Sequence, residues 1–75
     1  MSAMSRNNSK NAIGKHIKKF RQEKGISQDR LSKLADLSLN TVVNIESGGN
    51  LNPTIETLTK IANALGVKVD DLIKS

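Results

Sequence analysis

Residues 25–48 read GISQDRLSKLADLSLNTVVNIESG and predict two short helices joined by a tight turn. Ser27 is a good N-cap, because its hydroxyl can accept a hydrogen bond from a backbone amide that a helix start leaves unpaired. A first helix is therefore expected from Gln28 to about Ala35. The next three residues break the helical spacing, since Asp36 tolerates left-handed geometry and Ser38 is a second N-cap.

The second helix of the pair is expected over about residues 39–46. At 100° per residue, Val42 and Ile45 lie on one side of this helix, and Asn40 and Asn44 lie on the opposite side. One side is thus expected to pack against the rest of the protein. The other side offers two amide side chains on neighbouring turns.

Further residues around this helix pair match a known pattern. The pattern has an Arg in the preceding helix, a Gly-hydrophobic-Ser-Gln start, a Leu three residues later and then a small residue. It continues with a hydrophobic-Ser turn and closes with hydrophobic-Glu-x-Gly. The matching residues, in the same order, are Arg21, Gly25, Ile26, Ser27, Gln28, Leu31, Ser32, Leu37, Ser38, Ile45, Glu46 and Gly48. With these residues the chain resembles the Cro and phage-repressor helix-turn-helix family of DNA-binding proteins, the XRE type, over roughly residues 13–73. The resemblance implies an all-α, five-helix, lambda-repressor-like DNA-binding domain with the helix-turn-helix at its second and third helices. Asp36 stands where the family commonly has Gly, so the turn is expected to carry slight strain.

Three further helices are expected around the pair. One covers about residues 12–24, and Gly25 ends it by supplying the positive φ that suits the residue after a helix. Another covers about residues 55–65, after Thr54 as its N-cap. The last covers residues 69–73 and is expected to be the least well held, because Lys68 stands where the family usually has a capping Ser.

The composition is typical of one small domain with an aliphatic core. There is no Cys among the 75 residues, which excludes a disulfide framework and a thiolate zinc site. No apolar run approaches the ~20 residues of a membrane helix and the start of the chain lacks a secretory signal, so a soluble cytoplasmic protein is expected. Residues 1–10 are expected to be a flexible N-terminal arm, and residues 11–75 the helix-turn-helix DNA-binding domain. The expected core residues are Ile13, Ile17, Ile26, Leu31, Val42, Ile45, Ile55, Leu58, Ile61, Leu65, Val67 and Leu72.

Positive charge is concentrated in the first half of the chain. Residues 1–35 hold nine Lys or Arg against two acids, or +7, and residues 36–75 hold three against five, or −2, which gives the net charge of +5. The first half is therefore the side expected to face a polyanion. His16, the only histidine, lies among lysines and is expected at the surface without a role.

The outward side of residues 39–46 is the expected base-reading surface. Asn can bond an adenine edge bidentately in the major groove, and the methyl groups of Thr and Val suit the thymine methyl, so A·T pairs are expected to matter. No Lys or Arg lies between Lys33 and Lys60, which argues against arginine-to-guanine readout. Leu39 borders the packed side, and packing and base contact are equally open for it. The expected base-contacting residues are Ser38, Leu39, Asn40, Thr41, Val43 and Asn44.

Backbone phosphates are expected to meet helix starts and the loop over residues 47–53. Gln28 stands beside the free amides of a helix N-terminus, which favour an anion, and it matches the phosphate-contacting glutamine of the family. The Gly-Gly pair in the loop allows positive φ and free amides. The expected phosphate-contacting residues are Ser27, Gln28, Gly49, Asn50, Asn52 and Thr54. For Arg21 and Glu46 the resemblance implies a structural salt bridge beneath the DNA-facing surface.

Together these features predict a sequence-specific transcriptional regulator that binds double-stranded DNA with residues 39–46 in the major groove. The resemblance and the few phosphate contacts of one small module also favour a homodimer on a (pseudo)palindromic operator. The alternative is a protein-interaction module, such as an antitoxin that binds a partner toxin. An enzyme is not expected, because no group of residues suited to catalysis, a metal or another cofactor stands out.

Overall fold

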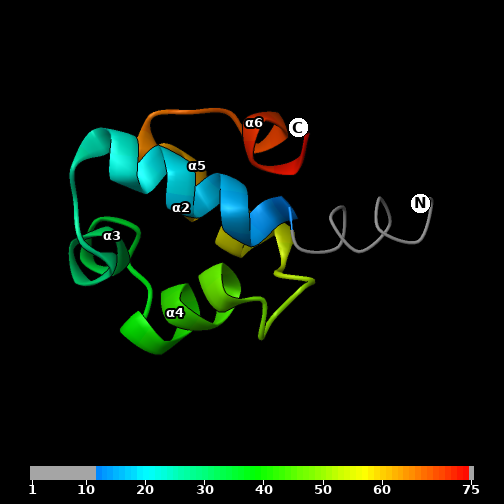
Figure 1. Ribbon diagram of the computed structural model, residues 1–75, viewed down its shortest axis with the longest axis horizontal. Helices are drawn as coiled ribbons and strands as arrows, with labels where there is room; N and C mark the ends of the chain where they lie inside the picture. Colours follow the sequence, from blue (N-terminus) through cyan, green and yellow to red (C-terminus); the bar gives the residue numbers. More distant parts are fainter. Residues whose placement is uncertain (1–11, 75) are drawn as a thin grey trace.

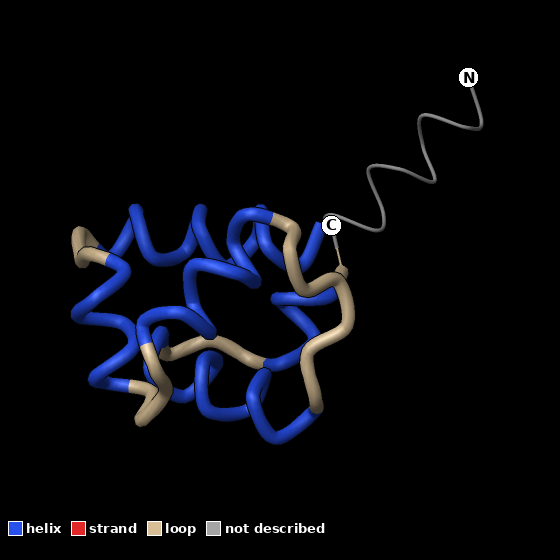
Figure 2. The backbone as a smooth tube through the Cα atoms, turned by 90° about the horizontal axis from the view of Figure 1, so that it is seen from below, coloured by secondary structure: helices blue, strands red, loops and turns tan. Residues whose placement is uncertain are grey.

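The computed structural model describes residues 12–74, which form five α-helices and no strand (Figure 1 and Figure 2). The helices are α2 (Ala12–Lys24), α3 (Gln28–Leu34), α4 (Leu39–Ser47), α5 (Ile55–Leu65) and α6 (Val69–Ile73). The all-α, five-helix prediction is confirmed for this part of the chain. The arm expected over residues 1–10 lies outside the described residues. None of the described helices is long and apolar enough to cross a membrane.

Side-chain caps fix where α3, α4 and α5 begin. The hydroxyls of Ser27, Ser38 and Thr54 each accept a hydrogen bond from the backbone amide three residues later, over 3.0, 3.1 and 3.1 Å. Such a cap contributes typically about 1 kcal/mol to stability. Gly48 and Gly66 end α4 and α5 with φ angles of 87° and 73°, which suit glycine because it has no Cβ.

The turn between α3 and α4 contains the strained residue that the sequence predicts. Asp36 has a φ of 57° and is the only non-glycine residue with positive φ among residues 12–74. The turn is closed by the amide of Leu37, which donates to the carbonyl oxygen of Ser32 over 2.8 Å. This turn sets the angle at which α4 leaves α3.

The core is aliphatic and receives side chains from all five helices. Its largest fully buried members are Ile17, Leu31, Val42, Ile45, Ile61 and Leu72. Ile55, expected in the core, is instead 66% exposed. Helical spacing places Ile55 on the same side of α5 as Leu58, but spacing does not tell whether a neighbouring element reaches far enough to cover the first turn of a helix.

α6 is anchored to α2 by contacts that the sequence does not reveal. His16 is half-buried, and its Nδ1 lies 2.8 Å from the carbonyl oxygen of Leu72, so the expectation of a surface histidine without a role is wrong. The carboxylate of Asp71 accepts a hydrogen bond from the backbone amide of Lys68 over 3.0 Å, which is the bond that the third helical residue makes in a capping box. α4 and α6 lie on opposite sides of α2 (Figure 1).

Candidate nucleic-acid interface

α4 presents both asparagines to solvent. Asn40 and Asn44 are exposed, one turn apart, whereas Val42 and Ile45 on the other side of the helix are 0% and 1% exposed. Val43 is 36% exposed beside the asparagines. Amide groups and a branched apolar side chain thus share the outward side of α4, which is what a helix needs to read base edges in a major groove.

At the start of α4, Ser38 and Leu39 are exposed and Thr41 is half-buried. The Ser38 hydroxyl accepts a hydrogen bond from the Thr41 amide over 3.1 Å and lies 2.8 Å from the Thr41 hydroxyl. Leu39 is 42% exposed and is therefore not part of the packed side. Base contact by these three residues stays a prediction.

A buried ion pair lies beneath the outward side of α4. Nε of Arg21 donates to Oε2 of Glu46 over 2.7 Å, and Nη2 donates to Oε1 over 3.0 Å. The two side chains are only 11% and 3% exposed. Nη1 of Arg21 donates to the carbonyl oxygen of Ile26 over 2.8 Å. The pair thus joins α2 to α4 and to the loop before α3.

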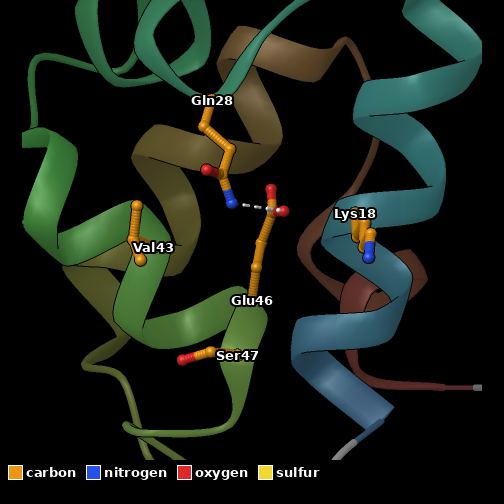
Figure 3. A pocket seen from close by; sticks show the side chains of 5 residues that line it. All are labelled: Lys18, Gln28, Val43, Glu46 and Ser47. Atoms are coloured by element: carbon orange, nitrogen blue, oxygen red, sulfur yellow. Dashed lines mark hydrogen bonds between the residues drawn. The ribbon is translucent and has the colours of Figure 1, made fainter.

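Gln28, the first residue of α3, bonds to the same carboxylate. Its Nε2 donates to Oε1 of Glu46 over 3.0 Å (Figure 3). The sequence does not reveal this bond, because it depends on how α3 and α4 meet in space. It occupies one of the two N–H donors of the Gln28 amide. The phosphate contact predicted for Gln28 would therefore use the other donor or the backbone amide.

Gly14 is a positioning residue that was missed in the sequence. It is buried within α2, and a Cβ atom at this position would overlap the carbonyl oxygen of Ile45 and lie 3.2 Å from that of Glu46. α2 and α4 therefore approach as closely as they do only because residue 14 has no side chain. The available signal was a glycine inside a helical pattern, which costs about 1 kcal/mol relative to alanine and often has a packing reason.

The backbone amides of the loop after α4 form hydrogen bonds within the protein. The Asn50 amide donates to the Asn44 carbonyl oxygen over 3.0 Å, and the Asn52 amide donates to Oδ1 of Asn50 over 3.0 Å. The Gly49 amide lies 3.4 Å from the Ser47 hydroxyl. The Gly48 amide donates to the Ile45 carbonyl oxygen over 3.2 Å. The expectation that the Gly-Gly pair offers free amides is therefore wrong. Phosphate contacts from this loop would come mainly from the exposed asparagine side chains.

Ser27 and Thr54, also predicted to meet phosphates, are exposed at the starts of α3 and α5. Both hydroxyl oxygens already accept a backbone amide, and the Thr54 hydroxyl also donates to the Thr57 hydroxyl over 3.0 Å. Their phosphate contacts stay predictions.

Next to α4, which carries no Lys or Arg, exposed cations lie on α2 and α3. They are Lys15, Lys18, Lys19, Lys24, Arg30 and Lys33. Lys33 pairs with Asp29 over 2.9 Å. Residues 12–74 contain no group of three or more His, Asp or Glu side chains that could hold a metal ion. The described surface thus offers amides on α4 beside positive charge on its neighbours.

A family model described as Helix-turn-helix matches residues 17–72. The chain belongs to the helix-turn-helix family. The immunity repressor protein of Bacillus phage phi105 is 34% identical over 61 residues, which make up 81% of this helix-turn-helix chain and 42% of the repressor. The transcriptional regulator SinR of Bacillus subtilis is 36% identical over 61 residues, which make up 81% of this chain and 55% of SinR. The chain thus spans about half the length of these curated relatives.

Solved helix-turn-helix structures share the fold. The N-terminal DNA-binding domain of SinR from Bacillus subtilis superposes with a TM-score of 0.84 and 34% identity, covering 87% of this chain and 94% of that domain. The restriction-modification controller protein C.AhdI from Aeromonas hydrophila superposes with a TM-score of 0.79 and 28% identity, covering 84% and 94%. The resemblance to Cro and phage-repressor proteins and the fold it implies are confirmed.

Proposed function

We propose that this helix-turn-helix chain is a sequence-specific, double-stranded DNA-binding module that regulates transcription, with α4 as its recognition helix in the major groove. The observation that carries the proposal is the exposure of Asn40 and Asn44 on a helix whose other side is fixed by the buried pair of Arg21 and Glu46. The likeness to the DNA-binding domain of SinR supports it.

Base reading in this proposal belongs to the outward side of α4. An asparagine side chain can accept a hydrogen bond from N6–H₂ of adenine through its Oδ1 while its Nδ2 donates to N7, and the Val43 methyl groups can pack on the thymine methyl. Each good contact of this kind contributes about 1–3 kcal/mol of discrimination. Because α4 carries no Lys or Arg, A·T pairs are expected to dominate each half-site.

Phosphate contacts fix the register of α4 on the duplex without reading sequence. On one side of α4 they are assigned to Ser27 and Gln28 at the start of α3. On the other side they are assigned to the loop that follows α4, through the side chains of Asn50 and Asn52, and to Thr54 at the start of α5. The exposure of Ser27, Asn50, Asn52 and Thr54 supports this assignment, and Gln28 is half-buried beside Ser27.

The proposal includes a homodimer that binds a (pseudo)palindromic operator with half-sites about 34–36 Å apart. A single module of this size makes few phosphate contacts, and joining two modules raises both the affinity and its salt dependence. The chain would act in the cytoplasm, by binding DNA rather than by catalysis and without a cofactor.

Selection of bound sites from a random DNA pool tests this function. The recovered sites should share two inverted, A·T-containing half-sites about one helical turn apart, and binding to them should weaken steeply between about 50 and 200 mM salt. Recovery of no common site, together with binding that does not respond to salt, would contradict the proposal. That result would favour a protein-interaction module, such as an antitoxin.

A further inference from the structure

A pocket of about 160 Å³ opens between α2, the start of α3 and α4. Its lining side chains are Lys18, Gln28, Val43, Glu46 and Ser47 (Figure 3). Val43 and Ser47 are exposed residues of α4, so the pocket borders the proposed base-reading side. Figure 3 shows Glu46 between Gln28 and the helix that carries Lys18.

The negative charge of the Glu46 carboxylate in this pocket is compensated by its neighbours. The Glu46 oxygens accept three hydrogen bonds, two from Arg21 over 2.7 and 3.0 Å and one from Gln28 over 3.0 Å. The positive charges of Lys18 and Arg21 and the negative charge of Glu46 leave this part of the surface with a net charge of +1. An anion can therefore approach on the side of Lys18.

Lys18 is the one cation lining this pocket, and it forms no ion pair within residues 12–74. The ion pairs within residues 12–74 are Arg21 with Glu46, Lys33 with Asp29, and Lys60 with Glu56. Lys18 is exposed and takes part in none of these pairs. Its charge is therefore available to a ligand.

The position of Lys18 beside α4 is fixed by its neighbours on α2. Gly14, four residues earlier, allows α2 to contact the backbone of α4 closely. Arg21, three residues later, bonds to Glu46 of α4. Residues at these spacings lie on the same side of a helix, so Lys18 stands between two contacts that hold α2 against α4.

We infer that Lys18 binds a backbone phosphate of the DNA strand that passes along the α2 side of the recognition helix. The inference rests on the proposed function and extends the contact surface to a residue outside the predicted set. Since α4 carries no cation, Lys18 supplies the positive charge on this side. A lysine ammonium suits a phosphate as a point charge.

The test compares salt dependence across three variants. Lys18→Gln removes the charge and Lys18→Arg keeps it. Lys74→Gln removes an exposed charge directly after α6, and this helix lies on the other side of α2 from α4 (Figure 1). The dissociation constant of each protein for a fluorescein-labelled duplex of random sequence is measured by anisotropy between about 50 and 200 mM salt. Far-UV circular dichroism checks that each variant is folded.

Lys18→Gln should make the slope of log affinity against log salt shallower by about 0.9 and weaken binding roughly three- to eightfold near 100 mM salt. Lys18→Arg and Lys74→Gln should keep the slope of the wild type. A Lys18→Gln slope equal to that of Lys74→Gln would overturn the inference while leaving the proposed function standing. A wild-type protein that binds the duplex without salt dependence would overturn both.

Discussion

The side-chain amide of Gln28 donates to the carboxylate of Glu46 over 3.0 Å, so the first residue of α3 and the last turn of α4 share a hydrogen bond. Arg21 of α2 bonds to the same carboxylate. A single buried anion therefore joins the three helices that form the proposed interface. The geometry of the base-reading helix relative to the predicted phosphate contacts depends on this one side chain.

Gln28→Ala is expected to lower the free energy of unfolding by about 1–2 kcal/mol, because it removes a half-buried hydrogen bond to a charged group. If Gln28 also contacts a phosphate, the variant should weaken binding to every DNA sequence by a similar factor. Urea denaturation and anisotropy measure the two effects, with Gln22→Ala, an exposed residue of α2, as the control. Unchanged DNA affinity would remove the phosphate role.

Arg21→Ala or Glu46→Ala alone should cost about 3–5 kcal/mol of stability, since either leaves an unpaired buried charge. The double variant Arg21→Met with Glu46→Leu should cost less than either single change, because no charge is then left unpaired. Lys33→Ala is the control, since its pair with Asp29 is exposed and should contribute about 0–1 kcal/mol. Urea denaturation measures all four, and a loss below about 1 kcal/mol for Arg21→Ala would show that the buried pair is not needed.

Gly14→Ala should destabilise the protein by about 1–3 kcal/mol, because a Cβ atom would force α2 away from the backbone of Ile45. In an exposed helix the same change would stabilise by about 1 kcal/mol. The sign of the effect thus decides between close packing and helix propensity. Thermal unfolding measures it, with Lys15→Ala on the exposed side of α2 as the control. A higher melting temperature for Gly14→Ala would contradict the close approach.

The helices could be predicted from the sequence because single capping and turn residues set where each helix begins or ends. Ser27, Ser38 and Thr54 act as the caps that their side chains predict, and Asp36 adopts the positive φ expected at the turn. The outward direction of Asn40 and Asn44 followed from spacing alone, since a helix that packs one side must expose the other.

Contacts between helices could not be predicted in the same way. The hydrogen bond from Gln28 to Glu46 joins residues 18 positions apart, and the one between His16 and Leu72 joins residues 56 positions apart. No pattern of neighbouring residues in the sequence predicts either bond. The exposure of Ile55 depends on how far its neighbours extend. The paired amides of the loop after α4 depend on the path that the backbone takes beyond Gly48.

The central claim is that Asn40 and Asn44 read base edges, and the most direct measurement is a ratio of two affinities. Dissociation constants are measured for the selected operator duplex and for a scrambled duplex, with wild type, Asn40→Ala, Asn44→Ala and, as a control on the exposed side of α5, Asn63→Ala. Each of the first two variants should lower the ratio of affinities by about 1–3 kcal/mol, roughly 5- to 150-fold, while binding to the scrambled duplex changes little. An equal loss on both duplexes, with the ratio unchanged, would contradict the claim.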